Sequence, residues 1–460
     1  MSHRLAPVAK LGLSILAGIL FALALLAGLA LRQAPRTYAS ALAYYVAPAG
    51  SDTNPGTATA PFRTIAHAAR LAAPGVVVHV APGTYTYNKL ATGASGTVTA
   101  RIVYVSDMKW GAKIVGTGYD RTWENTGNYV DIIGFDITNT YSQGRLGLIN
   151  YGSYVRAIGN HVHDIGTNWC DPNYGGAGID NANFSTGSND DVIGNVIDHV
   201  GPMGDSCADQ VQGIYHSVAG GYIVNNIVNN ISGFGIHLWH AASNVVIANN
   251  LAFGCGQAGI IVAAGDSPGQ TTQYAVNRGT IVVNNIAMDN QRYGIREYGN
   301  VSGATYAFND VYRNSVGAYY FVGGDTATHG LAVDPLFVNF QLNGSGDYDL
   351  QPSSPLIDAG TGMDAPSTDF DGNARPQRNG FDVGPYEIAS SDSSALPIPA
   401  PATAAVSAGT VTQSSRDAKT FDTDFAALLS KASVPLIVVT LLATGSGALA
   451  WHLRQRRKRW

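Results

Sequence analysis

The chain has 460 residues, 54 glycines and only 13% charged side chains, a composition typical of turn-rich all-β proteins rather than helical ones. All 32 acidic residues but only 18 of the 27 basic ones fall within residues 44–433, which gives this part a net charge of −14. Because phosphate backbones bind to basic surfaces, this charge excludes nucleic acid as the expected partner.

The N-terminal segment, residues 1–43, is predicted to direct export. An almost unbroken apolar run extends from Leu11 to Leu31, preceded by Arg4 and Lys10. Small residues near position 41 then match the pattern that signal peptidase cuts. An uncleaved membrane segment is the alternative, because the run is long enough to span a bilayer.

The middle of the chain repeats about every 24 residues, with insertions. One repeated position, after an apolar strand, is occupied by Asn160, Asn195, Asn226, Asn250, Asn285 and Asn309. A second repeated position, before a mostly aliphatic residue, is occupied by Gly178, Gly213, Gly235, Gly259, Gly294 and Gly317. Short β-branched strands at this period are predicted to coil into a solenoid in which each turn pairs with the next. The asparagine side chains are then expected to bond to their neighbours above and below.

Several motifs in this region resemble a known group of proteins. The repeated Asn-Asn-Ile and the segment 235–240, Gly-Ile-His-Leu-Trp-His, are similar to the pectate-lyase-like right-handed β-helix superfamily. Segments 45–47, 54–57, 61–65 and 81–85 resemble the N-terminal cap of that group, of the DUF1565 type. Segments 334–337, 355–360, 369–372 and 382–387 resemble the closing segment of surface-anchored β-helix proteins. The resemblance covers about 44–387 and implies an all-β, right-handed parallel β-helix solenoid whose end is covered by a helix near 62–73.

The chain is predicted to have five parts. They are an export segment (1–43), the capped β-helix (44–333), its closing segment (334–388), a disordered stalk (389–433) and a transmembrane anchor with a basic tail (434–460). Apolar residues 434–451 precede five Lys and Arg residues, which stay on the cytoplasmic side of a membrane. We therefore expect an exported monomer at the extracytoplasmic face of the cell membrane, held by a single C-terminal helix.

The strand after each repeated glycine is predicted to carry the functional site. Insertions at 164–178 and 199–213 precede this strand, another follows near 264–280, and insertions in a solenoid mark its working face. Because side chains alternate along a strand, the isoleucine of each repeat is expected to point inward. The next residues then point outward: Asp180, Tyr215, His237, Ile261, Arg296 and Tyr319. Two residues further along, the outward aromatic residues are Trp239, Tyr298 and Phe321.

Aromatic faces beside hydrogen-bonding groups suit sugar rings, so a polysaccharide or cell-surface glycan is the expected partner. The candidate catalytic residues are Asp180, His237, Arg296, Asp205 and Asp209. The candidate substrate-binding residues are Trp169, Tyr215, Trp239, His240 and Tyr298. The carboxylates of Asp171, Asp205 and Asp209 are candidates for holding calcium, the one cofactor expected.

The three cysteines are predicted to form one disulfide. Cys170 and Cys207 occupy matching loops of consecutive turns, which predicts a bond between them. Cys255 is then expected to be free and buried. A nearby acidic pair, Asp190 and Asp191, does not continue into the Asp-Asp-x-x-Asp calcium pattern of one lyase family and is predicted to be a solvated turn.

A polysaccharide lyase or uronate epimerase is the first functional expectation. In both, a base removes the proton beside the uronate carboxylate while calcium or arginine neutralises that carboxylate. The resemblance implies a Lys or Arg base, yet no lysine lies between Lys113 and Lys419. Arg296, or else His237, would then have to act.

Two alternatives stay open. A glycoside hydrolase needs two carboxyl groups, which Asp180 with Asp205 or Asp209 could supply. A non-catalytic glycan-binding or adhesin-like surface protein would use the same strand face without turning over a substrate.

Overall fold

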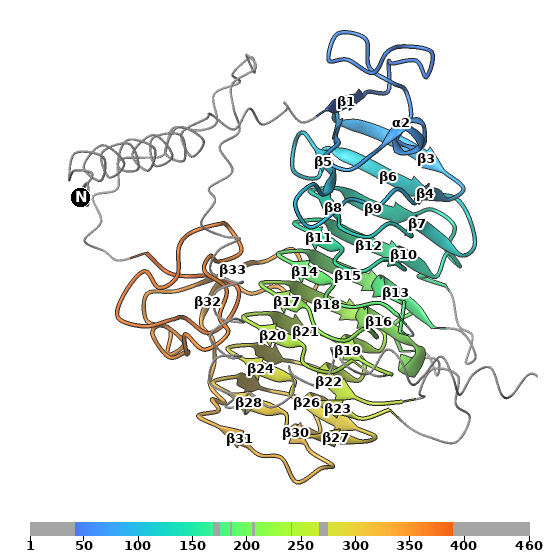
Figure 1. The fold of residues 1–460 in the computed structure, drawn as a ribbon. Coiled ribbons are helices and arrows are strands. Elements are labelled where there is room, and N and C mark those ends of the chain that lie inside the picture. The colour runs from blue at the N-terminus through green and yellow to red at the C-terminus, as the bar shows by residue number, and fades with distance from the viewer. Residues whose placement is uncertain are drawn as a thin grey trace, which may run out of the picture. The chain divides into compact units, whose positions relative to one another are not determined.

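The computed structural model describes residues 42–168, 175–184, 186–204, 208–240, 242–265 and 275–389. Three long parallel sheets dominate these residues (Figure 1). Each full turn of the coil adds one strand to sheet A, one to sheet B and one to sheet C, in that order along the chain. The structure confirms the predicted all-β solenoid.

Sheet A contains β1 (Ala43–Val46), β2 (Val77–Val80), β5 (Ile102–Ser106), β8 (Val130–Ile133), β11 (Arg156–Ile158), β14 (Asp191–Ile193), β17 (Tyr222–Val224), β20 (Val246–Ala248), β24 (Ile281–Val283), β28 (Thr305–Ala307) and β31 (Ala327–Thr328). Sheet B contains β3 (Gly83–Tyr87), β6 (Ala112–Gly116), β9 (Asp136–Asn139), β12 (His161–Ile165), β15 (Val196–Val200), β18 (Ile227–Ile231), β21 (Leu251–Phe253), β25 (Ile286–Met288) and β29 (Asp310–Tyr312). Sheet C contains β4 (Leu90–Thr92), β7 (Arg121–Asn125), β10 (Leu146–Asn150), β13 (Gly176–Asn181), β16 (Val211–His216), β19 (Phe234–Leu238), β22 (Ala258–Ala263), β26 (Tyr293–Tyr298) and β30 (Gly317–Tyr320). Outside these sheets, β23 (Asn277–Arg278) pairs with β27 (Val301–Ser302), and β32 (Phe337–Asn339) pairs with β33 (Asp347–Leu350).

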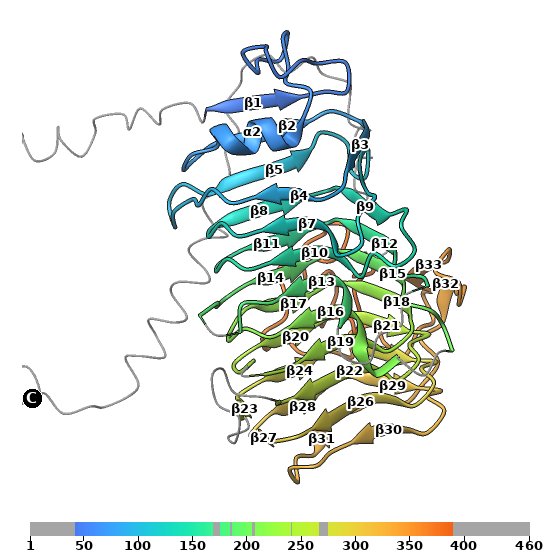
Figure 2. The same cartoon turned by 90° about the vertical axis from the view of Figure 1, so that its right-hand side faces the viewer.

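A short helix, α2 (Ile65–Leu71), lies at the N-terminal end of the coil (Figure 2). The side chain of Thr64 accepts a hydrogen bond from the backbone N–H of His67 and so caps the helix. Ile65, Ala68 and Ala69 are buried, which keeps water from the apolar interior of the first turns. The helix falls within the range predicted from the sequence.

The predicted asparagine ladder stands at the corner between sheets A and B. From Asn195 onward, each ladder Oδ1 accepts hydrogen bonds from the backbone N–H and the Nδ2 of the ladder residue one turn earlier, at 2.9–3.0 Å. The Oδ1 of Asn160 accepts from the backbone N–H of Phe135 at 3.0 Å. The six side chains are fully buried. Because a buried amide without partners is costly, the ladder fixes each turn against the next.

The residue before each ladder position has a left-handed backbone. Its φ is between 55° and 61°, a conformation that glycine and asparagine adopt at the lowest cost. Glycine occupies this position in the earlier turns, as in Gly159 and Gly194, the next three turns use Asn225, Asn249 and Asn284, and the last uses Phe308.

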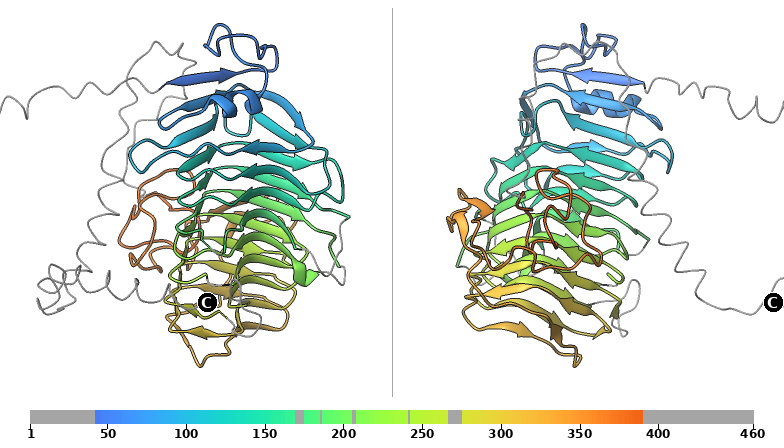
Figure 3. Two further views of the ribbon diagram at one scale, coloured as in Figure 1. Left: turned by 45° about the vertical axis from the view of Figure 1, so that its right-hand side comes forward. Right: turned by 90° about the vertical axis from the view of Figure 1, so that its left-hand side faces the viewer.

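These three asparagines bind the C-terminal segment, residues 334–389. The Nδ2 of Asn225 donates to the carbonyl of Thr368 at 2.7 Å, and the Nδ2 of Asn249 donates to that of Gly384 at 2.9 Å. Asn284 both donates to the carbonyl of Thr361 and accepts from its N–H. The segment therefore lies along the side of the coil, over its later turns, rather than across its end (Figure 3).

The same segment covers apolar side chains on the outer face of sheet B. Ile227, Leu251, Phe253, Ile286 and Met288 pack against five residues of the segment, Phe337, Tyr348, Leu350, Leu356 and Val383. Within the segment, the buried guanidinium of Arg375 pairs with the carboxylate of Glu387 at 2.5 Å. The C-terminal segment thus contains a buried ion pair of its own and packs on sheet B with an apolar face.

The predicted location at a membrane is contradicted. Within the ranges that the structure describes, no helix is long and apolar enough to cross a membrane. Residues 1–41 and 434–460, on which the export signal and the C-terminal anchor were predicted, lie outside the described residues.

Removing one ladder side chain tests the energetic role of the corner. Asn226→Ala leaves the backbone N–H of Asn195 and the carbonyl of Val192 without their partners inside the coil. We expect the free energy of unfolding to fall by about 3 kcal/mol, measured by chemical denaturation. The exposed Asn88→Ala is the matched control, with a change below about 0.5 kcal/mol. Equal losses in the two variants would contradict the ladder's role.

Candidate functional site

The outer face of sheet C carries the predicted strip. Cα pairing places Asp180, Tyr215, His237, Ile261 and Arg296 on successive turns of one column. The isoleucines beside them form the inward column and are fully buried. Neighbouring strands lie about 4.8 Å apart, so the outward side chains form one continuous surface.

The predicted last member of the column is wrong. Tyr319 pairs with Ile295 on the inward side, and Tyr320 lies opposite Arg296. Phe321, also predicted to point outward, packs with Tyr319 against the core. The error arises because Ala318, not Gly317, continues the glycine column, 24 residues after Gly294.

Arg296 lies among aromatic rings. Its guanidinium carbon is 5.7–5.9 Å from the ring centroids of Phe234, Tyr293, Tyr298 and Tyr320. The Nε of Arg296 has no hydrogen-bond partner among the described residues. These contacts hold the cation by the ring faces and leave hydrogen-bonding capacity for an anion.

His237 is a buried, neutral imidazole. Only 6% of the residue is exposed, and neither ring nitrogen has a hydrogen-bond partner among the described residues. Burial, followed by the charges of Arg296 and His240, lowers the pKa of His237 to about 3. The ring contacts Tyr215 and Trp239 edge-on, at centroid distances of 5.4 and 5.5 Å. His237 is therefore unprotonated at neutral pH, and no hydrogen bond among the described residues occupies its nitrogens.

Asp180 is also buried, but its pKa is raised, whereas that of His237 is lowered. It is 8% exposed, and its Oδ1 has no partner within the described part of the chain. Burial raises the pKa of Asp180 to about 7, although the charges of Arg145 and Arg121 act against it. A carboxyl group in this state carries a proton near neutral pH.

The aromatic candidates surround these groups. Trp239 stacks on Tyr298, with centroids 5.7 Å apart and planes 23° apart. His240 stacks on Phe184 at 4.1 Å and meets the edge of Tyr215. The strip therefore offers several flat faces beside one cation, one neutral imidazole and one carboxyl group.

Several candidates belong to loops that the structure does not describe. Trp169, Asp171, Asp205, Cys170 and Cys207 lie outside the described residues, so the disulfide stays a prediction. Cys255 is free and buried, as predicted. Asp209 is exposed in the short 3-10 helix η1 (Ala208–Gln210).

Asp190 and Asp191 are structural rather than solvated. Asp190 is fully buried and accepts a hydrogen bond from the backbone N–H of Val155 at 2.8 Å. Asp191 accepts one from the backbone N–H of Tyr222 at 2.9 Å. The two carboxylates join neighbouring turns at sheet A, away from the strip on sheet C.

A second polar group lies on the outer face of sheet B and was not predicted. Asp136 pairs with His161 across β9 and β12, and His163 pairs with Asp198 across β12 and β15. Burial alone would lower the pKa of His161, but hydrogen bonds to Asp136 and Asp198 raise it to about 9. The sequence contains one indication of this group. His161 and His163 lie two residues apart directly after the ladder residue Asn160, so both point to the same face of the strand.

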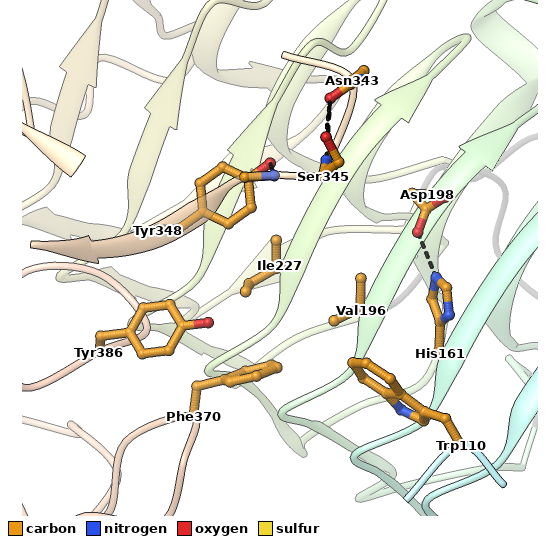
Figure 4. A pocket seen from close by; sticks show the side chains of 12 residues that line it. Trp110, His161, Val196, Asp198, Ile227, Asn343, Ser345, Tyr348, Phe370 and Tyr386 are labelled. Atoms are coloured by element: carbon orange, nitrogen blue, oxygen red, sulfur yellow. Dashed lines mark hydrogen bonds and ion pairs between the residues drawn. The ribbon is translucent and has the colours of Figure 1, made fainter. Parts of the chain in front are cut away.

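A pocket of about 420 Å³ begins beside this group (Figure 4). His161 and Asp198 of the coil line it together with Val196 and Ile227. The aromatic lining residues are Trp110, Tyr348, Phe370 and Tyr386. The coil therefore supplies one wall of the pocket, and the C-terminal segment supplies another.

Residues 44–329 match the model of the family described as Pel9A-like, right handed beta helix region. The chain belongs to this family. The right hand predicted for the coil is thus that of its family, and the resemblance to the pectate-lyase-like superfamily is confirmed.

Two solved structures are similar to this Pel9A-like β-helix, and the first of them shows a shared fold. The crystal structure of pectate lyase Pel9A has a TM-score of 0.52 and 19% identity, over 75% of this chain and 96% of that chain. A rhamnogalacturonan lyase has a TM-score of 0.44 and 16% identity, over 68% and 96% of the two chains. At these identities the likeness concerns the fold alone.

One curated relative shares a short stretch of sequence. The uncharacterized protein YwoF of Bacillus subtilis (strain 168) is 51% identical over 53 residues. These residues are 12% of this chain and 11% of that protein, so the match spans about a tenth of the relative's length.

The raised pKa of Asp180 makes the stability of this Pel9A-like β-helix depend on pH. An aspartate with an ordinary pKa of 3.8 ionises on unfolding, whereas folded Asp180 holds its proton up to about pH 7. Stability is therefore lost as pH rises through this window, and Asn, which cannot ionise, avoids the loss. We expect Asp180→Asn to raise the free energy of unfolding little at pH 4 and by about 2–4 kcal/mol at pH 8.

Thermal or denaturant unfolding across this pH range measures the effect. The exposed Asp209→Asn is the matched control and should show no such trend. A gain that is independent of pH would show that Asp180 is ionised in the folded state.

Proposed function

We propose that the chain acts on an acidic polysaccharide along the sheet C strip, by removing the proton beside a uronate carboxylate. The observation that carries this proposal is the pair formed by His237 and Arg296. His237 is neutral with two unbonded nitrogens, and Arg296 is a cation whose Nε is free of partners among the described residues. A base and a carboxylate-binding cation on one face are the two groups that such chemistry requires.

The two groups are coupled in a way that favours the reaction. Arg296 contributes to the low pKa of His237, so a substrate carboxylate paired with Arg296 would cancel part of that charge. The pKa of His237 would then rise when the substrate binds, and its basicity would increase where it is needed. The paired carboxylate would in turn stabilise the negative charge that develops on the sugar.

The remaining residues of the strip fit supporting roles. Tyr215, Trp239 and Tyr298 offer ring faces on which sugars stack. The protonated carboxyl group of Asp180 could donate a proton to the leaving oxygen of a lyase reaction. The families that the chain resembles suggest lysine or arginine as the base. Because this chain has no lysine between Lys113 and Lys419, His237 takes that role in the proposal.

Calcium has no role in the proposed proton removal. Within the described residues, no group of three carboxylates converges on the strip, and Asp209 stands exposed on η1. A calcium site formed by Asp171, Asp205 and Asp209 stays a prediction, because the first two lie outside the described residues. In the proposal, Arg296 supplies the neutralising charge.

Non-catalytic glycan binding is the second candidate. It is favoured by the burial of His237, which must become accessible before it can act on a substrate. The aromatic faces and Arg296 would then bind an acidic glycan without turnover.

Incubation of the full chain with polyuronates and neutral glycans, with and without chelator, tests the proposal. Ultraviolet absorbance of unsaturated ends, reducing sugar and uronate epimerisation are followed together. We expect activity on a polyuronate that falls at least about 100-fold in kcat for His237→Ala. Arg296→Gln should lower kcat and raise KM. His329→Gln, at an exposed histidine outside the strip, should leave the activity unchanged.

The other outcomes each point to one alternative. Reducing ends without absorbance would indicate hydrolysis and direct attention to Asp180. Retention of glycan without any turnover, weakened by Arg296→Gln but not by His237→Ala, would indicate a binding protein.

A further inference from the structure

The polar group on sheet B has the arrangement of a metal site. Four outward side chains form a polar lattice over three successive strands, with Asp136 of β9 opposite His161 of β12 and His163 of β12 opposite Asp198 of β15. The two histidines lie two residues apart on β12, so both point to the same face. None of these residues belongs to the strip on sheet C.

One ligand atom from each of Asp136, His161 and His163 converges. These atoms all lie within 4.8 Å of one another. The Nε2 of His163 is 3.2 Å from Oδ1 of Asp136, and the Nδ1 of His161 is 3.7 Å from Oδ2 of Asp136. Ligand atoms about 2.0–2.2 Å from a tetrahedral metal ion are roughly 3.4 Å from each other. The donors therefore already stand near the spacing that one ion requires.

The other nitrogen of each histidine contacts a separate carboxylate. The Nε2 of His161 is 2.7 Å from Asp198, and the Nδ1 of His163 is 2.8 Å from Asp164. A carboxylate on the far nitrogen is the usual support of a metal-bound histidine, because it fixes the ring and leaves the near nitrogen as a lone pair. With these hydrogen bonds in place, two nitrogen lone pairs face the carboxylate of Asp136.

Such an arrangement requires positive charge at its centre. Lone pairs on two nitrogens and a carboxylate repel one another unless a cation lies between them. Two protons, one on each imidazole, or a single divalent ion would meet this need. Three carboxylates, of Asp136, Asp164 and Asp198, surround the histidines, and the exposed Lys113 lies opposite Asp136 on β6.

We propose that Asp136, His161 and His163 bind one divalent transition-metal ion of the zinc class on the outer face of sheet B. Two imidazoles and one carboxylate suit zinc and its first-row neighbours, whereas calcium and magnesium prefer all-oxygen sites. Three protein ligands leave a further coordination position for water or another ligand. The site is independent of the activity proposed for the strip.

Titration of the full chain, stripped with chelator, tests the site. Calorimetry with zinc chloride is expected to show one ion per chain, and Co²⁺ should give the visible absorption of a tetrahedral site. Calcium chloride should not displace zinc from this site. Asp136→Asn and His163→Gln are each expected to weaken zinc binding by more than about 100-fold, and Asp198→Asn by about 10- to 100-fold.

A second histidine–aspartate pair provides the matched control. His79 contacts Asp107 at 2.8 Å on sheet A, with no third ligand beside it, among the described residues. His79→Gln should leave zinc affinity unchanged. Zinc should also raise the Tm of the native chain and of His79→Gln, but not that of His163→Gln.

The proposal is overturned by specific results. They are the absence of saturable zinc binding, equal affinity in His163→Gln and His79→Gln, or displacement of the bound zinc by calcium. Circular dichroism of each metal-free variant shows whether it is folded, and two independent ligand variants guard against the failure of one. If the native chain is folded but does not bind zinc, the group is a network of protonated histidines and carboxylates.

Discussion

The need to satisfy buried amides at the corner between sheets A and B governs the rest of the molecule. Each ladder asparagine is fully buried and bonds to the turns on both sides of it, so a turn cannot slip without leaving several polar groups unpaired. With the register of each turn fixed at this corner, side chains on all three sheets stack in columns. The strip on sheet C and the lattice on sheet B are both consequences of this stacking.

The outer faces of the sheets differ because each column can carry its own chemistry. On sheet C, the turns from β13 to β26 place aromatic and ionisable groups outward. On sheet B, the earlier turns carry histidines and aspartates, whereas the later turns carry apolar side chains that the C-terminal segment covers. One coil thus separates an aromatic strip, a polar lattice and a docking face by turn and by sheet.

Much of the fold could be predicted from the sequence, because the signals that carry it repeat. The asparagine and glycine columns revealed the coil, and strict alternation placed Asp180, His237 and Arg296 on one face. Tyr319 was misplaced because a glycine stands one position before the true member of its column, and a single repeat gives no check on such a shift. Asp190 was misjudged because a carboxylate that accepts a hydrogen bond from a backbone N–H in the preceding turn has the same local sequence as an exposed turn.

Other features could not be predicted, for physical reasons. The lattice on sheet B joins residues from turns of unequal length, so Asp136 and His163 reveal their proximity only when the ladder is aligned first. The path of the C-terminal segment depends on long-range contacts such as Asn249 with Gly384, which no local pattern encodes. The reaction itself is not fixed by the fold, because one scaffold hosts many chemistries.

The change from glycine to asparagine at the left-handed corners gives the coil evenly spaced side-chain amides, which fix the position of the C-terminal segment along it. Asn225, Asn249 and Asn284 stand on three consecutive turns, and their partners in the segment must match a spacing of about 4.8 Å per turn. Whole turns could be gained or lost before Asn225 without disturbing this match. A turn gained between Asn225 and Asn284 would move these asparagines apart, so this stretch of the coil must keep its number of turns.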